Sequence, residues 1–143
     1  MTTTIPLSAP VPLRITAPTD VALMQALLDR VIALLTPSGD DAPDHPEARA
    51  LIGFRSVAVD LPALACLVVE DALAEADAQD ARVVAADVSG VMRTDEGWRC
   101  WGFLDVEPSG NPIPTAVRMD SVAVERMGRT LVLVGAVRIE DEP

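Results

Sequence analysis

The chain has 143 residues, half of them apolar, and carries a formal net charge of −11 at pH 7. This length fits one domain with a real core, and the apolar content excludes a disordered chain. We therefore expect a single domain over residues 1–143. A surface of this charge repels nucleic acid and anionic lipid, so we expect direct binding to neither. A protein with a basic surface remains a possible partner.

Several features predict a cytoplasmic protein. No apolar run approaches the roughly 20 residues that a membrane span needs. The N-terminus "MTTTIPLSAP" lacks the basic region and the apolar core of a signal peptide. The two cysteines, Cys66 and Cys100, fall in predicted regular elements, which favours two buried free thiols over a disulfide.

The first part of the chain predicts a strand followed by a helix. Residues 1–10 are a loosely held lead-in, and "VPLRIT" at 11–16 alternates as a strand does. Proline cannot donate a ladder hydrogen bond, so Pro12 predicts an edge position or the start of a strand. Thr19 or Asp20 caps the helix that follows. Its apolar residues continue with helical spacing to Leu35, and Pro37 stops it.

A second strand and helix follow an acidic loop at 37–48. Residues 51–59 read as a strand, Asp60 caps the next helix, and Pro62 suits its first turn. This helix continues to about Asp77. Its C-terminal half carries four acidic residues, which oppose the helix macrodipole, and solvation or a basic partner would account for them.

From residue 81 onward the pattern indicates strands. The segments 81–94 and 97–107 flank "DEG" as a hairpin, and the segments 116–127 and 130–141 flank Gly128 and Arg129 as a second one. The fold class is therefore α/β of the α+β kind. We expect about six mostly antiparallel strands in a sheet or small sandwich, with two helices packed on one side. Exposed hairpin edges make a homodimer plausible.

The two strand–helix units resemble each other weakly. "LRITAPTDVALMQAL" and "FRSVAVDLPALACLV" each carry an Arg early in the strand and an Asp at the helix start. Any two capped strand–helix units share this much.

No constellation of residues predicts catalysis. The only histidine, His45, lies among loop acids whose spacing does not fit a calcium loop, so we interpret the loop as a solvated one. No serine lies in a GxSxG elbow, and no glycine-rich phosphate loop is present. Trp98 and Trp101 lie on opposite faces of one strand. We interpret them as core and edge cover, although an exposed Trp is also a suitable anchor for a partner.

The layout resembles the archease family, the small activators of the RNA ligase that splices tRNA. The resemblance covers roughly residues 7–141. "LSAPVPLRITAPTDVALMQAL" lies over the family's first strand and helix, "VAVDLPALACLVVEDALAEAD" retains Asp60 and Leu61 of the second motif, and "TAVRMD" lies over a later strand. The resemblance implies an archease-like fold.

The polar motif residues of the family are not retained at the matching positions, which are Leu7, Pro10, Thr115, Asp120 and Arg138, and the family's glycine falls on Pro12. Pro10 replaces a metal-binding Asp and offers neither charge nor donor. Arg138 in the other ligand position would repel a cation. We therefore expect the family's metal site to be lost and the prolines to mark the loss. A shifted alignment of the last strand would instead offer Glu140 or Asp141.

These observations predict a non-catalytic, archease-like accessory or chaperone-like protein that acts through protein–protein interaction and needs no cofactor. The first alternative is a metal-dependent activator of the tRNA-splicing RNA ligase. It would hold Ca²⁺ or another divalent cation with Asp60, Glu140 and Asp141. The second alternative is a small-ligand-binding protein with an apolar cleft between helices and sheet.

Overall fold

The structure is a computed structural model that describes residues 10–35, 49–108 and 115–141. The elements follow in the order β1 (Val11–Ala17), α1 (Asp20–Leu35), β2 (Ala50–Ala58), α2 (Leu61–Ala78), β3 (Ala81–Thr94), β4 (Gly97–Pro108), β5 (Thr115–Met127) and β6 (Thr130–Asp141). Every predicted helix and strand is present with nearly the predicted bounds. The predicted acidic loop at 37–48 and most of the lead-in at 1–10 lie outside the described residues.

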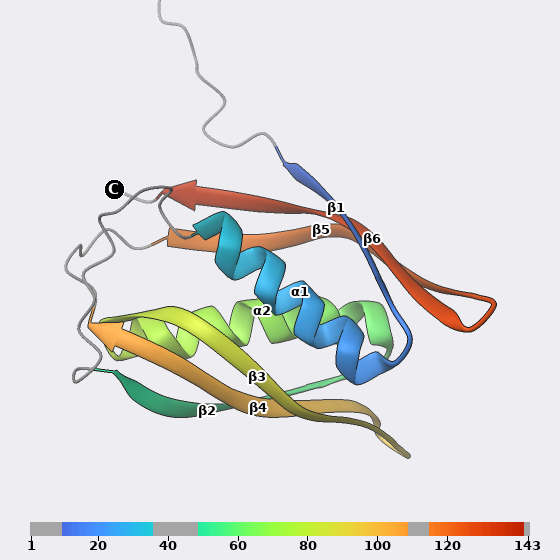
Figure 1. Cartoon of the computed structure of the whole chain (residues 1–143), viewed down its shortest axis with the longest axis horizontal. Coiled ribbons are helices and arrows are strands. Elements are labelled where there is room, and N and C mark those ends of the chain that lie inside the picture. The colour runs from blue at the N-terminus through green and yellow to red at the C-terminus, as the bar shows by residue number, and fades with distance from the viewer. Residues whose placement is uncertain (1–9, 36–48, 109–114, 142–143) are drawn as a thin grey trace, which may run out of the picture.

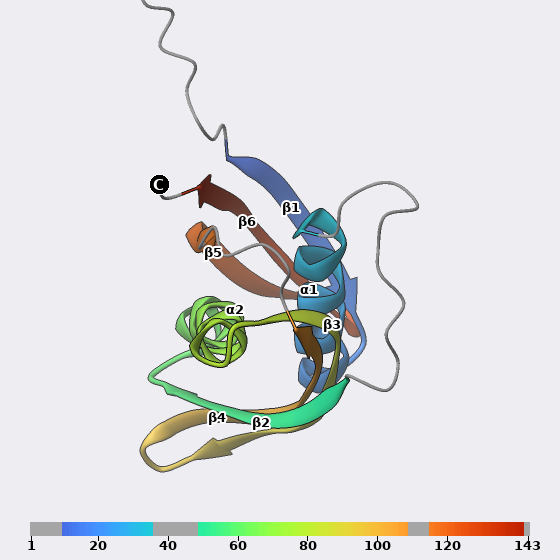
Figure 2. The ribbon, with the colours of Figure 1, turned by 90° about the vertical axis from the view of Figure 1, so that its left-hand side faces the viewer.

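The strands form two antiparallel sheets of three, in the orders β1-β6-β5 and β2-β4-β3. Both helices lie between the sheets, with α2 beside β2 and β5, and α1 beside β1 and β3 (Figures 1 and 2). Each sheet therefore buries one face against the helices and leaves the other face outward. The predicted α+β class with six antiparallel strands is confirmed.

Both helices begin at a side-chain cap and bury one apolar face. The Thr19 hydroxyl accepts a hydrogen bond from the Ala22 amide at 3.1 Å, and an Asp60 carboxylate oxygen accepts one from Ala63 at 2.8 Å. The predicted caps at Thr19 and Asp60 are therefore confirmed. The most deeply buried helix side chains pack with those of the central strands in one core. The largest fully buried side chains are Leu23, Met24, Leu27, Leu28, Leu64, Leu104 and Leu133.

Two-residue loops close both predicted hairpins. Thr94 pairs with Gly97 across the β3–β4 turn, and Met127 pairs with Thr130 across the β5–β6 turn. Gly97 and Gly128 have φ angles of +134° and +66°, which glycine adopts without steric cost. Each hairpin is long and contains at least one bulge, which bends it around the helices.

The strand register shows that the resemblance between the two strand–helix units extends to the whole sheet that contains each of them. Leu13 pairs with Gly135 in β6, and Phe54 pairs with Gly102 in β4. Continuing along both strands, Val134 corresponds to Trp101, and Ala136 to Phe103. In the hairpins, the bulge between Asp120 and Ala123 corresponds to the bulge between Val88 and Gly90, since Asp120 pairs with Ala136 and Asp87 pairs with Phe103.

The helices obey the same correspondence. Thr19 and Asp60 are N-caps at equivalent positions. Counted from these caps, the buried residues of α1 and α2 lie at largely the same positions along each helix. We call β1, α1, β5 and β6 the first half, and β2, α2, β3 and β4 the second half. The second half is continuous in sequence and lies between the two parts of the first.

Candidate functional site

The structure does not bring the three candidate metal ligands together. Asp60 caps α2 at its N-terminus, whereas Glu140 and Asp141 pair with Ala116 and Thr115 at the last positions of β6. These two places lie at opposite ends of the molecule, as Figure 1 shows. In the described ranges no three His, Cys, Asp or Glu residues are grouped to hold a metal ion.

The structure does bring together Pro10 and Arg138, two positions that the archease resemblance singled out. Pro10 precedes Val11, which pairs with Val137, and Arg138 follows Val137. Pro10 and Arg138 therefore lie next to each other across the β1–β6 pair. The Arg138 guanidinium lies 3.5 Å from the Asp120 carboxylate, so this place holds a cation and a proline rather than two carboxylates.

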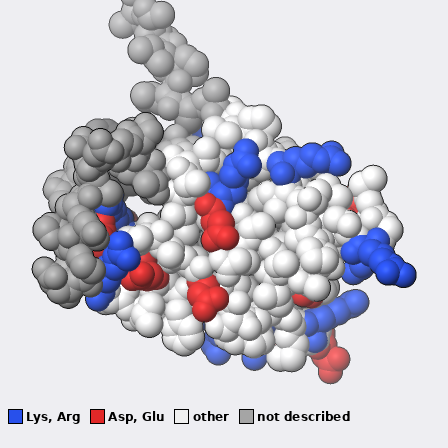
Figure 3. Space-filling model, viewed as in Figure 1, with Lys and Arg blue, Asp and Glu red and all other residues white. Residues whose placement is uncertain are grey.

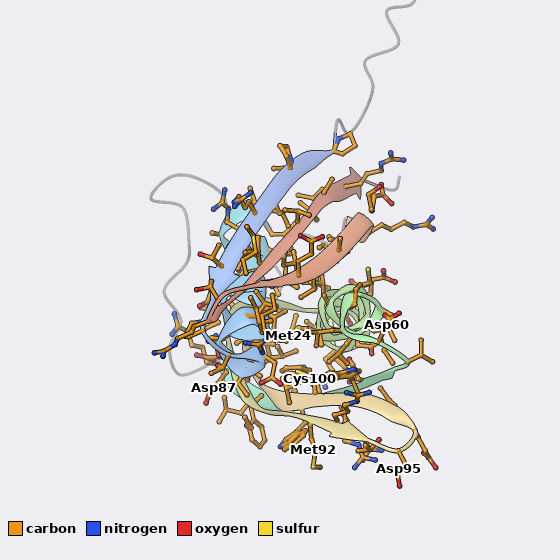
Figure 4. The ribbon with its side chains drawn as sticks, turned by 90° about the vertical axis from the view of Figure 1, so that its right-hand side faces the viewer. Met24, Asp60, Asp87, Met92, Asp95 and Cys100 are labelled. Carbon is orange, nitrogen blue, oxygen red and sulfur yellow. The ribbon has the colours of Figure 1, made fainter. Side chains whose placement is uncertain are left out.

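The two cysteines are free, as predicted. Cys100 is buried, and burial together with nearby Asp20 raises the pKa of its thiol to about 12. Its side chain points toward the helices (Figure 4). Cys66 is only half-buried, so the prediction of two buried thiols is right for one. Burial raises its pKa, and the charges of Glu70, Asp120 and Asp60 add to the rise.

The two tryptophans lie on opposite faces of β4, as predicted. Trp98 packs against the core, and Trp101 lies on the outer face, where its ring covers the position of Gly90. Exposed apolar side chains share this outer face with Trp101. Phe103 is 51 % exposed, Leu51 72 % and Met92 46 %. Figure 4 shows Met92 pointing away from the helices.

An open hollow of about 680 Å³ lies on this outer face and reaches the edge of the sheet at β2. It is lined by Gly53, Phe54, Arg55, Glu75, Met92, Arg99, Trp101, Gly102 and Phe103. Arg55 and Arg99 form no ion pair with another described residue, and the Nε of Arg99 is buried without a hydrogen-bond partner. The small-ligand alternative placed a cleft between helices and sheet, whereas this hollow lies on the opposite face.

Two acidic residues of α2, Asp71 and Glu75, lie beside this edge of β2, and two more, Glu70 and Asp77, are exposed on the same helix. We call Glu70, Asp71, Glu75 and Asp77 the acidic row; α2 contains no basic residue. Asp71 faces β2, because its carboxylate accepts a hydrogen bond from the buried Ser56 hydroxyl at 2.7 Å. Glu75 comes one turn later and lines the hollow near Gly53 and Arg55.

The acidic row is matched only in part in the first half, where Asp29 of α1 stands at the position of Glu70. The α1 residues at the positions of Asp71 and Glu75 are Arg30 and Leu34. The face on which α1 lies shows acidic and basic side chains interspersed (Figure 3). Glu70, Glu75 and Asp77 are exposed. None of the four acids of the row forms an ion pair with a described arginine. This helix therefore carries a local concentration of acidic side chains that form no ion pair among the described residues.

The sequence drew attention to the acids of α2 but not to the outer face beside them. Arg55, Arg99 and Phe103 became visible only when the register placed β2 and β4 side by side. One signal in the sequence was the alternation in β2. Leu51, Gly53, Arg55 and Val57 share one face of the strand, and this face is unusually apolar for a face that is exposed to solvent.

No family model matches the sequence, and no curated protein matches it. Neither helix in the described ranges is long and apolar enough to cross a membrane.

Proposed function

We propose that this protein is a non-catalytic accessory protein that binds another protein through the acidic row of α2 and the adjoining edge of β2. The partner presents a basic surface to the acidic row. The protein acts in the cytoplasm, to which its free cysteines are suited. The sequence resembles the archease family, and an RNA ligase is one partner that this resemblance suggests.

The acidic row carries this proposal. Acids in the second half of a helix oppose the macrodipole, so they do not stabilise the helix by their position. Three of them are exposed and form no ion pair with a described residue, and Asp71 is held in place by Ser56. A basic partner surface would relieve the mutual repulsion of the row and would also be steered toward it.

The exposed apolar side chains beside the row supply the second element of a protein interface. Leu51 and Val57 of β2 and Phe103 of β4 are each about half exposed or more. Interfaces typically combine an apolar centre with a charged rim, and aromatic residues are enriched in the centre.

Charge reversal tests the proposal. Glu70→Arg/Glu75→Arg reverses half of the acidic row. Glu96→Arg/Glu125→Arg makes the same charge change at exposed positions elsewhere and is the matched control. Wild type and both variants are used to capture proteins from a lysate of the native cells. The most abundant captured protein is then purified and titrated against all three.

We expect the α2 variant to lose at least about tenfold in affinity and the control to stay within about twofold, with wild-type affinity falling as salt rises. Equal binding by wild type and the α2 variant would contradict the proposal.

A further inference from the structure

The edge strands β1 and β2 differ in whether proline residues protect the free edge of the sheet. β1 pairs only with β6, and β2 pairs only with β4, among the described strands. Pro12 lies in β1, and Pro10 and Pro18 flank the strand. The register places Gly53 at the position of Pro12. At the same spacing, Leu51 and Val59 correspond to Pro10 and Pro18.

Proline on an edge strand is a known protection against the addition of a further strand. The first half has three such prolines in and beside β1. They all lie at even-numbered positions, so along an extended strand their nitrogens point to the same side. The second half has no proline at the equivalent positions. Its edge instead exposes Leu51 at 72 %, Val57 at 48 % and Val59 at 80 %.

The proline also indicates which amides of β2 face outward from the sheet. A strand tolerates proline only where the missing N–H would point away from the neighbouring strand. The N of Pro12 therefore faces the free edge, and so does the N–H of Gly53. Because hydrogen-bonding direction alternates along a strand, Leu51, Arg55 and Val57 also present their N–H and C=O groups to this edge.

The two sides of the free edge differ in chemistry. On the inner side, Asp71 and Glu75 lie next to β2, and Glu70 lies further out on the same helix. On the outer side, the neighbours are the apolar side chains of Leu51, Val57 and Phe103 and the Arg55 guanidinium. A strand added here would place alternate side chains in these two environments.

We propose, building on the function proposed above, that the free edge of β2 accepts an extended basic segment of the partner protein as a fourth strand of the sheet. Alternate residues of that segment are Arg or Lys and face the acidic row. The residues between them are apolar or uncharged polar and face outward. Backbone hydrogen bonds give the affinity, and the alternation gives the specificity.

Charge argues against a second copy of this chain as the added strand. Antiparallel pairing of β2 with β2 of another copy would place α2 beside α2 on the same face of one continuous sheet. Both helices carry the acidic row without a basic residue. The like charges on the two adjacent helices would repel each other, whereas a basic segment would be attracted.

The test uses the peptide Ac-Arg-Thr-Arg-Val-Arg-Thr-Arg-NH2, titrated into the ¹⁵N-labelled full chain and followed by chemical-shift changes, which also detect weak binding. Control peptides replace each Arg by Glu, or carry N-methyl groups on the backbone amides. Gly53→Pro closes the edge as Pro12 closes the edge of β1. Gly53→Ala is the matched control, since a Cβ at Gly53 finds only the Gly102 carbonyl within 4 Å, at 3.9 Å.

We expect binding of the Arg peptide, with shift changes centred on β2. Gly53→Pro should weaken it at least about tenfold, while Gly53→Ala changes it less than about threefold. The Glu peptide and the N-methylated peptide should not bind. The fold of Gly53→Pro is checked from the shifts of the first half, which should not move.

The outcomes separate this inference from the proposed function. If Glu70→Arg/Glu75→Arg weakens peptide binding and Gly53→Pro does not, the acidic row binds basic proteins but the edge of β2 is not used. If the Arg peptide does not bind, this inference fails, and the proposed function is decided by the titration of the partner protein against Glu70→Arg/Glu75→Arg. If the peptide binds and neither change matters, both proposals fail. A dimer of the free chain that dissociates in Gly53→Pro would show that the edge takes a second copy instead.

Discussion

The two halves of the molecule share a framework but differ in what they leave open. In the first half, β1 has prolines in and around its free edge, and its neighbour α1 has Arg30 and Leu34 on the side where α2 has Asp71 and Glu75. In the second half, β2 has an unprotected edge beside an acidic helix. The framework therefore explains the fold, and the differences between equivalent positions indicate where the molecule binds.

The outer faces of the two sheets differ in the same direction. Trp101 and Phe103 of β4 correspond to Val134 and Ala136 of β6. The arginine of the edge strand is common to both, as Arg14 and Arg55. Large apolar side chains therefore gather on the sheet whose edge is open, as expected of an interface.

The largest difference in stability is expected at the equivalent glycines of the central strands. A Cβ at Gly102 would overlap the Asp87 carbonyl oxygen and approach the Val88 Cα to 3.0 Å. A Cβ at Gly135 would meet the Val122 Cγ2 at 3.0 Å and the Asp120 carbonyl at 3.3 Å, which needs a smaller adjustment.

Gly102→Ala should therefore lower the free energy of unfolding by roughly 2–4 kcal/mol, and Gly135→Ala by about 1 kcal/mol. Urea unfolding of both variants measures the difference. Equal losses would show that the two bulges pack alike and would weaken the comparison.

The next difference concerns the helix residue above each bulge. In the second half's hairpin, Gln25 of α1 donates to the Ala86 carbonyl and accepts from the Val88 amide, both at 2.8 Å. The equivalent residue of α2 is Cys66, beside β5. Gln25→Ala should cost about 2 kcal/mol because two backbone groups lose their partner, and Cys66→Ala about 1 kcal/mol or less. Thermal or urea unfolding tests this, and a larger cost for Cys66→Ala would contradict it.

A third difference is the pH dependence of the free energy of unfolding, which arises mainly from Cys100 in the second half. Cys100 lies in β4 at the position of Leu133 in β6. Its pKa is near 9.0 when unfolded and about 12 when folded, so the folded state retains the proton longer. The related stability is fully present below about pH 8.5 and is lost as the pH rises toward 12.

The free energy of unfolding should therefore fall by about 1 kcal/mol between pH 9 and pH 10. The chain has no lysine and no tyrosine, so the cysteines dominate titration in this range. Urea unfolding at both pH values measures the fall. Cys100→Val should remove most of it, and an undiminished fall in that variant would refute the assignment to Cys100.

The smallest effect is expected at the outer face itself. Phe103 is 51 % exposed, so Phe103→Thr should change the free energy of unfolding by less than about 1 kcal/mol. The same change should weaken binding of the basic peptide, since Phe103 flanks the edge of β2. A large loss of stability would show that this face is a structural part of the sheet.

Much of the fold was predictable because the local signals agree with one another. The caps at Thr19 and Asp60, the helical spacing of the buried leucines and the two-residue turns each specify their element without help from distant residues. The edge position of Pro12 followed from its missing N–H and is confirmed. The separation into two sheets was not specified, because strand alternation does not say which strands become partners.

The candidate site was less predictable, because it depends on residues that the chain brings together from a distance. The acids of α2 were visible as an unfavourable feature of that helix. The position of Asp71 and Glu75 beside an open strand edge became apparent only from the Ser56–Asp71 hydrogen bond, the hollow and the order β2-β4-β3. The metal hypothesis for Asp60, Glu140 and Asp141 rested on an alignment, and the structure places these residues at opposite ends of the molecule.

Residue-resolved amide hydrogen exchange along β2 tests the central claim most directly. In the free protein, the amides of Leu51, Gly53, Arg55 and Val57 should exchange much faster than those of Ile52, Phe54 and Ser56, which face β4. Saturation with the basic peptide should slow the first set and leave the second unchanged. Uniform protection in the free protein, or no change on saturation, would show that the edge of β2 is not an open docking site.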